Sequence, residues 1–171
     1  MRWIWIDRIL ELERGKRCLA IKNVTLAEDV LHDHFRATAN HPAQPVMPNT
    51  LIIEAMAQTA GILVGHANDF TEKVILAKIT TARFCAVAPP GYCLKFAAQI
   101  ERIDAAGAAT TGTVERIDVA TGKSQHLADI DLIFSHIDKN MSGLEFPDHN
   151  FVFTDQFFDI LRQSGFTPPG G

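Results

Sequence analysis

Cysteine is scarce in this sequence and shows no pairing pattern. The three cysteines, Cys18, Cys85 and Cys93, are an odd number at wide spacing, which argues against the disulfide framework of a small secreted domain. The sequence also has no Cys-x-x-Cys pair of the kind that holds zinc. We therefore expect three reduced, mostly buried thiols in a reducing compartment.

A basic excess, a signal peptide and a long membrane span are also lacking. The 20 Asp and Glu residues outnumber the 16 Lys and Arg residues, and the resulting net charge of −4 argues against a nucleic-acid binder. The apolar run in residues 1–7 is too short for a signal peptide. The most apolar stretch, residues 50–65, contains Glu54 and Gln58 and falls short of a membrane span. We expect a cytoplasmic protein that binds no nucleic acid and does not insert into a membrane.

The hydrophobic pattern predicts six strands and one long helix. Apolar and polar residues alternate along the predicted strands, which are residues 2–12, 17–26, 73–87, 92–103, 108–118 and 125–137. The helix is residues 50–67, and Asn49 is its expected N-cap. Short turns join the last four strands, so neighbouring strands are antiparallel. Two strands, a helix and a four-stranded meander predict an α+β chain with the hot-dog fold, a curled antiparallel sheet wrapped around a central helix.

The predicted helix is apolar around most of its circumference. Its less apolar positions, Glu54, Gln58, Gly61 and Gly65, share one narrow stripe at helical spacing. A helix of this kind must be enclosed by other structure. A carboxylate in such a place costs several kcal/mol unless it is paired. Glu54 is therefore either a functional carboxylate or one that meets solvent at a gap and bonds Gln58 one turn on.

Three histidines lie in the irregular segment of residues 27–49, just before the helix. His32, His34 and His41 could suggest a metal site, but such spacing is common by chance and no cysteine contributes, so we expect no metal. A loop histidine delivered to a helical glutamate is a plausible pair for general acid–base chemistry.

The segment that joins these histidines to the helix resembles a family signature. His34-Phe35 precedes residues 42–58, PAQPVMPNTLIIEAMAQ. This resembles the 3-hydroxyacyl-acyl-carrier-protein dehydratases, in which His-Phe-Pro runs into Pro-(Val/Ile)-(Met/Phe)-Pro-Gly and then into a helix bearing Leu-x-x-Glu-Ala-Met-Ala-Gln. The resemblance covers about residues 4–137.

The resemblance implies a reaction and a set of roles. The substrate is a (3R)-hydroxyacyl thioester on acyl carrier protein, and the product is a trans-2-enoyl thioester made in fatty-acid or related lipid biosynthesis. His34 would remove the C2 proton, and Glu54 would protonate the departing C3 hydroxyl. The helix start at Asn49 and Thr50 would hold the thioester carbonyl, and Gln58 is a further substrate-binding residue.

The resemblance also implies how the site is assembled. His and Glu of one site come from different subunits in this family, so we expect a homodimer or a higher homo-oligomer. No metal or organic cofactor is required. An apolar channel would hold the acyl tail, and Met56, Phe84 and Phe96 are candidates for it, although plain core is the more common role of such residues.

This sequence departs from the family signature in two places that affect the site. Residues 36–41 are inserted between His34-Phe35 and Pro42. His34 matches the family histidine by its neighbours. By distance to Glu54 along the chain, the family position falls on Asn40, and the adjacent His41 is therefore the substitute. The family's glycine at the helix start is Asn49 here, which keeps the backbone N–H but is larger.

Two other functions stay open for a protein of this fold. One is an acyl thioesterase, and the other is a non-catalytic acyl-binding or structural subunit whose insertion has displaced the histidine. The motif in residues 42–58 disfavours a thioesterase, because thioesterase sites usually rest on an acidic residue without a loop histidine in such a motif.

Residues 138–171 form a predicted extension to a hot-dog domain of residues 1–137. Six of the eleven phenylalanines lie in this extension, which is unlike the composition of a disordered tail. We predict that residues 154–164 form a helix that packs on the body of the protein or on a partner subunit.

Overall fold

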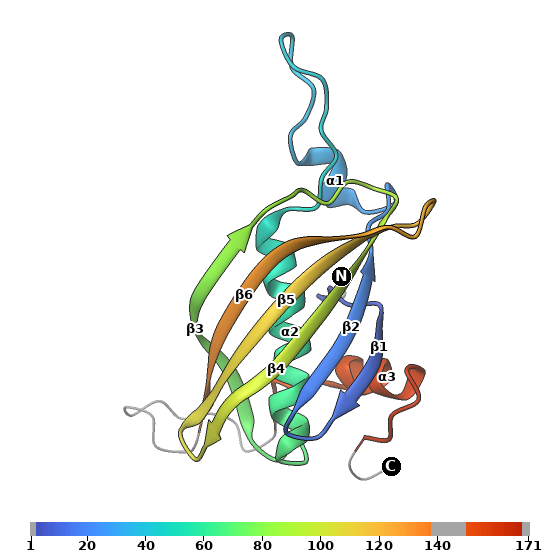
Figure 1. Cartoon of the computed structure of the whole chain (residues 1–171). Coiled ribbons are helices and arrows are strands. Elements are labelled where there is room, and N and C mark those ends of the chain that lie inside the picture. Colours follow the sequence, from blue (N-terminus) through green and yellow to red (C-terminus); the bar gives the residue numbers. More distant parts are fainter. Residues whose placement is uncertain (1–2, 138–149, 169–171) are drawn as a thin grey trace.

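The computed structural model describes residues 3–137 and 150–168, and within them a six-stranded sheet curves around one long helix (Figure 1). The elements in chain order are β1 (Arg8–Glu13), β2 (Arg17–Asn23), α1 (Asp29–Asp33), α2 (Asn49–Ala67), β3 (Lys73–Phe84), β4 (Tyr92–Asp104), β5 (Gly107–Asp118), β6 (Ser124–Ile137) and α3 (Asp155–Gln163). The predicted curled antiparallel sheet around a central helix is confirmed.

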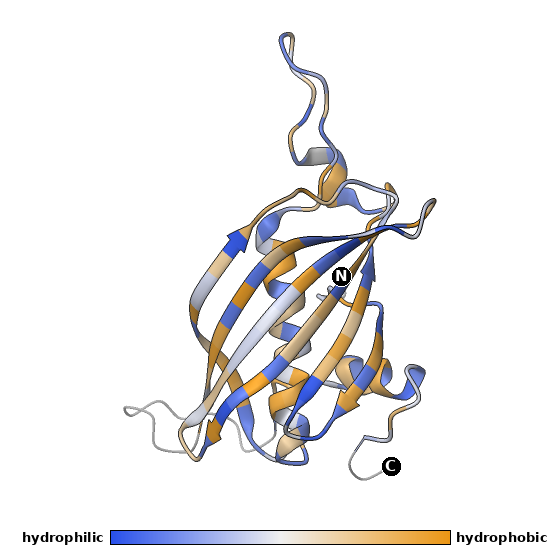
Figure 2. Cartoon of the chain, in the orientation of Figure 1, coloured by the Kyte–Doolittle hydropathy of each residue, from blue (hydrophilic) through white to orange (hydrophobic). Residues whose placement is uncertain are grey.

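The strand order in the sheet is β1-β2-β4-β5-β6-β3, and all pairs are antiparallel. Short turns place β4, β5 and β6 side by side. The strand that follows α2, β3, pairs with β6 and not with β4, so the predicted four-stranded meander is wrong and only β4, β5 and β6 form a meander. β3 forms one edge of the sheet, while β1 forms the other. Hydrophobic and hydrophilic residues alternate along the strands, as expected for a sheet with one covered face (Figure 2).

The helix α2 lies against the inner face of this sheet and supplies much of the core. Its buried residues include Ile52, Met56 and Leu63, and Phe96 of β4 is also fully buried. Met56 and Phe96 are therefore core residues. By length and composition α2 does reach the level of a membrane span, against our expectation, but 67% of that stretch is buried inside the fold.

The start of α2 differs from the prediction. Pro48 occupies the N-cap position, and no side chain caps the helix. The Pro48 carbonyl accepts hydrogen bonds from the N–H groups of Leu51 (3.0 Å) and Ile52 (3.2 Å). Asn49 is already the first helical residue, so the prediction that it is the N-cap is wrong. The extended backbone of Pro48 begins the helix one residue earlier than the polar side chain suggested.

The segment before α2 contains structure that the sequence did not reveal. The helix α1 is five residues long, and residues 35–44 form a hairpin that projects from the body (Figure 1). The backbone N–H of Gln44 donates to the Phe35 carbonyl at 3.0 Å, and Thr38 donates to His41 at 2.9 Å. The insertion therefore closes on itself and leaves the flanking residues next to the body.

The described part of the C-terminal segment crosses the lower end of α2 from the β3 side to the β1 side (Figure 1). At one end, the Asn150 amide donates to the carbonyls of Phe70 (3.1 Å) and Glu72 (3.0 Å). At the other end, the Ser164 hydroxyl accepts from the Ile9 N–H at 2.9 Å, so α3 lies against the edge strand β1. Phe146 lies outside the described residues. The division into residues 1–137 and 138–171 stays a prediction.

The packing of this segment on α2 yields a prediction about Gly65. A Cβ there would lie 2.7 Å from Cε2 of Phe153 and 2.8 Å from Cδ1 of Phe70, both aromatic rings held by neighbours. Gly65→Ala should therefore lower the free energy of unfolding by about 1–3 kcal/mol, because the rings must shift. Chemical denaturation measures the effect.

Gly61→Ala is the matched control on the same helix. Its Cβ would meet only Cε1 of Phe134, at an ordinary 3.7 Å. Alanine is the better helix former, so Gly61→Ala should be neutral or stabilising by up to about 1 kcal/mol. Equal changes in the free energy of unfolding for the two substitutions would show that the Phe153 ring does not require a residue without a Cβ at position 65.

Candidate active site

Glu54 is half-buried on α2 and lines a pocket with residues of β3 and β6. Its Oε1 accepts a hydrogen bond from Nε2 of Gln58 at 2.9 Å. This bond to Gln58, one helical turn later, is the one expected if Glu54 is a carboxylate at a solvent gap. Among the residues that the structure describes, no group donates a hydrogen bond to the second carboxyl oxygen, which is therefore available to other partners.

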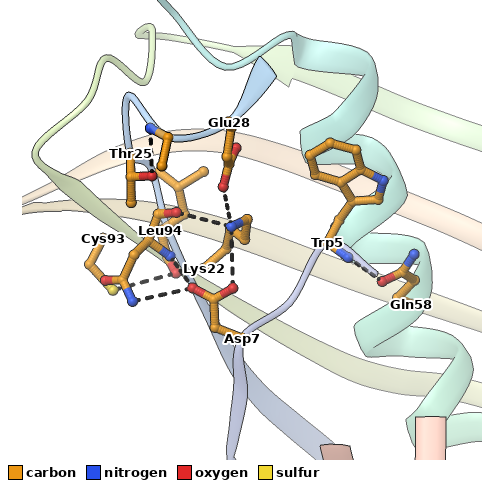
Figure 3. A network of polar contacts seen from close by, with 10 residues as sticks. Trp5, Asp7, Lys22, Thr25, Glu28, Gln58, Cys93 and Leu94 are labelled. Atoms are coloured by element: carbon orange, nitrogen blue, oxygen red, sulfur yellow. Dashed lines mark hydrogen bonds and ion pairs between the residues drawn. The ribbon is translucent and has the colours of Figure 1, made fainter. Parts of the chain in front are cut away.

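Gln58 is a buried polar centre with three protein partners. Its Nε2 also donates to the Trp3 carbonyl at 3.1 Å. Its Oε1 accepts from the Trp5 N–H at 2.8 Å (Figure 3). The side chain is 6% exposed, so these bonds satisfy an amide that would otherwise be costly to bury. Gln58 therefore ties the segment before β1 to α2 and holds the Glu54 carboxyl in one orientation.

An apolar pocket of about 170 Å³ lies beside Glu54. Its walls come from α2, β3, β6 and the C-terminal segment, and include Gly61, Leu76, Phe134 and Phe157. Glu54 is the one charged residue among those that line it. The arrangement can present a carboxyl group to an apolar chain.

His34 lies at the other end of the site, next to the start of α2. It is the C-cap residue of α1, and its backbone N–H bonds the Val30 carbonyl at 3.1 Å. Its side chain lines a second pocket, of about 400 Å³, together with Asn49 and Thr50. Within the described residues, the N–H groups of Asn49 and Thr50 have no hydrogen-bond partner, as the first groups of a helix often do not.

One chain does not bring His34 and Glu54 into a shared pocket. They line two different pockets, one at the start of α2 and one beside β3. His41 lies on the projecting hairpin and lines a third pocket with Phe35 and Gln44, which includes no residue of α2. Of the two histidines, His34 is thus the one beside the helix start.

The remaining histidine of this segment and the cysteines have other surroundings. Nε2 of His32 is 2.7 Å from the Leu26 carbonyl. In residues 3–137 and 150–168, no group of three His, Cys, Asp or Glu side chains could hold a metal ion. Burial raises the pKa of the Cys18 thiol to about 12, which makes it a poor nucleophile, whereas Cys85 is exposed rather than buried as expected.

Lys22 is a second buried polar centre, which the sequence patterns missed. Its ammonium group is 3.2 Å from Oδ1 of Asp7 and 3.1 Å from the Asn23 carbonyl, and it also pairs with Glu28 (Figure 3). Glu28 directly precedes α1, so this ion pair fastens the start of α1 to β2. The far end of α1 carries His34. A buried lysine between two acidic residues is hard to find from sequence, because the two acidic residues come from two other segments of the chain.

A family model described as the FabA-like domain matches residues 3–123. Among curated proteins, the 3-hydroxyacyl-[acyl-carrier-protein] dehydratase FabZ of Caldanaerobacter subterraneus subsp. tengcongensis is 42% identical over 102 residues, which are 59% of this chain and 68% of the relative. The protein with the same name from Acidovorax sp. is 43% identical over 105 residues, with the same two shares.

Solved structures show the same fold at low identity. The dehydratase heterocomplex ApeI:P from Xenorhabdus doucetiae superposes with a TM-score of 0.59 at 16% identity, over 80% of this chain and 85% of that one. An acyl-CoA hydrolase variant from Staphylococcus aureus in complex with coenzyme A gives 0.57 at 16% identity, over 93% and 88%. These likenesses confirm the predicted hot-dog fold, and at this identity they carry no argument about activity.

The partners of Gln58 yield a second prediction. Gln58→Met keeps the approximate volume but leaves the Trp5 N–H and the Trp3 carbonyl without partners. The free energy of unfolding should fall by about 1–3 kcal/mol. Trp3 and Trp5 are the two tryptophans of the chain, so their fluorescence should shift to longer wavelength as the segment loosens. Gln99→Met, at an exposed position of β4, is the control and should change neither value. Unchanged emission from Gln58→Met would contradict the tie between this segment and α2.

Proposed function

Because the chain belongs to the FabA-like family, we propose that it dehydrates (3R)-hydroxyacyl groups, carried as thioesters on acyl carrier protein, to trans-2-enoyl thioesters. The reaction serves fatty-acid or related lipid biosynthesis. The observation that carries the proposal is the position of Glu54, which is the one charged residue among those lining an apolar pocket. Gln58 holds its Oε1, and the other carboxyl oxygen can face a substrate.

Glu54 and His34 divide the proton transfers. His34 takes the proton from C2 as the bond between C3 and the hydroxyl oxygen breaks. Glu54 gives a proton to that oxygen, which leaves as water, and the electron pair from C2 forms the C2–C3 double bond. Gln58 donates to Oε1 of Glu54, so the other oxygen can carry the proton toward the substrate. The role of Gln58 in this scheme is positioning.

The start of α2 supports the charge that develops during proton removal. The N–H groups of Asn49 and Thr50 lie at the positive end of the helix dipole, and His34 lines the same pocket. They would hold the thioester carbonyl oxygen, where negative charge accumulates as C2 loses its proton. Backbone donors serve this purpose with asparagine as well as with the family's glycine.

A second copy of the chain completes the site. His34 and Glu54 line separate pockets of one chain, and Glu54's pocket borders β3. The edge strand β3 exposes apolar side chains, Ile75, Leu76 and Ile79, along its length. An unpaired apolar edge is a template for another strand. Pairing of β3 with β3 of a second copy would bring the partner's residues to the pocket of Glu54.

The third prediction concerns the two proton-transfer residues. Glu54→Gln and His34→Ala should each lower kcat by about 10² to 10⁴, because each removes one acid–base group. The assay is hydration of a trans-2-enoyl thioester, followed by the loss of its ultraviolet absorbance. His41→Ala, on the projecting hairpin, is the control and should retain activity.

Three results of that assay would contradict the assignments. Full activity in Glu54→Gln or in His34→Ala would remove that residue from the mechanism. An inactive His41→Ala beside an active His34→Ala would place the base on the hairpin. Loss of the enoyl absorbance together with an equal release of free thiol would replace the dehydratase with a thioesterase, because hydration leaves the thioester intact.

The fourth prediction concerns assembly through β3. Ile79→Lys places a charge on the exposed edge, where Ile79 is 44% exposed, and should convert the dimer to a monomer with little activity. Val119→Lys changes a residue that is 66% exposed in the turn after β5, and should stay dimeric and active. Sedimentation velocity at micromolar concentration measures both. An active monomeric wild type would contradict the shared site.

A further inference from the structure

Residues 150–153 together with α3, here called the C-terminal strap, contribute to the pocket of Glu54. Val152, Phe153 and Phe157 line this pocket opposite α2. The family model ends at residue 123, so these three residues come from a part of the chain that the family match does not include.

The strap is held firmly where it forms this wall. Oδ1 of Asn150 accepts from the N–H groups of Val152 (3.0 Å) and Phe153 (3.3 Å), while its amide nitrogen bonds two carbonyls of the body. Phe153 is 5% exposed and meets the Phe70 ring edge to face, with ring centroids 5.0 Å apart. Phe157 in turn meets the ring of Phe153 at 6.3 Å. A wall fixed by hydrogen bonds and interlocked rings does not yield easily to a long ligand.

The space left between this wall and Glu54 is small. A cavity of about 150 Å³ is enough for a molecule the size of benzene. The pocket has a volume of about 170 Å³, so it holds an apolar chain of roughly six carbons. A longer chain that runs from Glu54 toward the strap would meet Val152 or Phe157, which line this side of the pocket.

We propose that the C-terminal strap forms the closed end of the acyl pocket, and that Val152 and Phe157 limit the length of the acyl chain that reaches Glu54. The proposal rests on the dehydratase function proposed above, and it names the substrate class as short-chain 3-hydroxyacyl thioesters. The strap is thus a specificity element of this chain, in addition to covering α2 and the edge strand β1.

Two neighbouring phenylalanines of α3 separate this role from simple packing. Phe157 and Phe158 are both half-buried. Phe157 lines the pocket, whereas Phe158 is absent from its lining and packs against Phe70, with ring centroids 5.6 Å apart. Phe157→Ala and Phe158→Ala each remove one phenyl ring from α3, but only Phe157→Ala enlarges the pocket.

The test compares chain-length profiles. The substrates are trans-2-enoyl pantetheine thioesters from crotonyl to decenoyl, and the readout is the ratio of kcat/KM for decenoyl to that for crotonyl. The wild type should prefer the short chains. Phe157→Ala should raise the ratio at least about 10-fold, since one methylene that an apolar pocket accepts or rejects is worth roughly 10- to 200-fold. Phe158→Ala should leave the ratio unchanged.

Val152→Phe should make the pocket smaller without creating a cavity. It should therefore reduce the activity on hexenoyl relative to crotonyl thioester. The proposal is overturned if Phe157→Ala keeps the wild-type ratio, or if Phe158→Ala shifts it equally. A wild type inactive on every chain would contradict the proposed function instead. In that case the affinity for saturated acyl pantetheines, from butanoyl to decanoyl, is measured instead. Phe157→Ala should bind the long chains more tightly than the wild type does, and equal affinities would overturn the inference.

Discussion

The helix α2 has apolar side chains around most of its circumference, and a single curled sheet can cover only part of it. The rest of the chain is arranged around this constraint. The C-terminal strap crosses one part of the uncovered face, and the segment with Trp3 and Trp5 covers another. Of the narrow stripe, Gln58 and Gly65 are buried in this way, while Glu54 and Gly61 stay half-buried and line the pocket. The candidate site is therefore the place on α2 that one chain leaves incompletely covered, and the proposed second copy would meet the same surface.

Two buried polar side chains position the chemistry within this frame. The Gln58 amide bonds Glu54 and the backbone of the segment before β1. Lys22 joins Asp7 to Glu28 at the start of α1 (Figure 3). Breaking either centre would leave buried groups without partners, so both keep their neighbours in one arrangement. One centre orients the proposed acid, and the other anchors the helix that ends at the proposed base.

The long helix and the strands of the meander were predictable, because they have strong periodicity and clear turns. The start of α2 was misjudged, since Pro48 takes the cap position that the side chain of Asn49 suggested, and α1 is too short to show a pattern. The bond between Glu54 and Gln58 follows from helical spacing. The contacts of Gln58 with Trp3 and Trp5, and the wall formed by Phe157, join segments far apart in the chain, which periodicity does not report. The choice between His34 and His41 depends on how an insertion folds, which periodicity does not report; the structure places His34 beside the start of α2 and His41 on the hairpin, and His34 as the base stays a proposal.

A mixing experiment tests the shared site most directly. Glu54→Gln and His34→Ala subunits are purified separately, combined under conditions of subunit exchange, and assayed for hydration of an enoyl thioester. If the base and the acid come from different subunits, half of the randomly mixed dimers carry one intact site, and activity should return to about a quarter of the wild-type value. Confirmed subunit exchange with no return of activity would contradict a site built from His34 of one copy and Glu54 of the other.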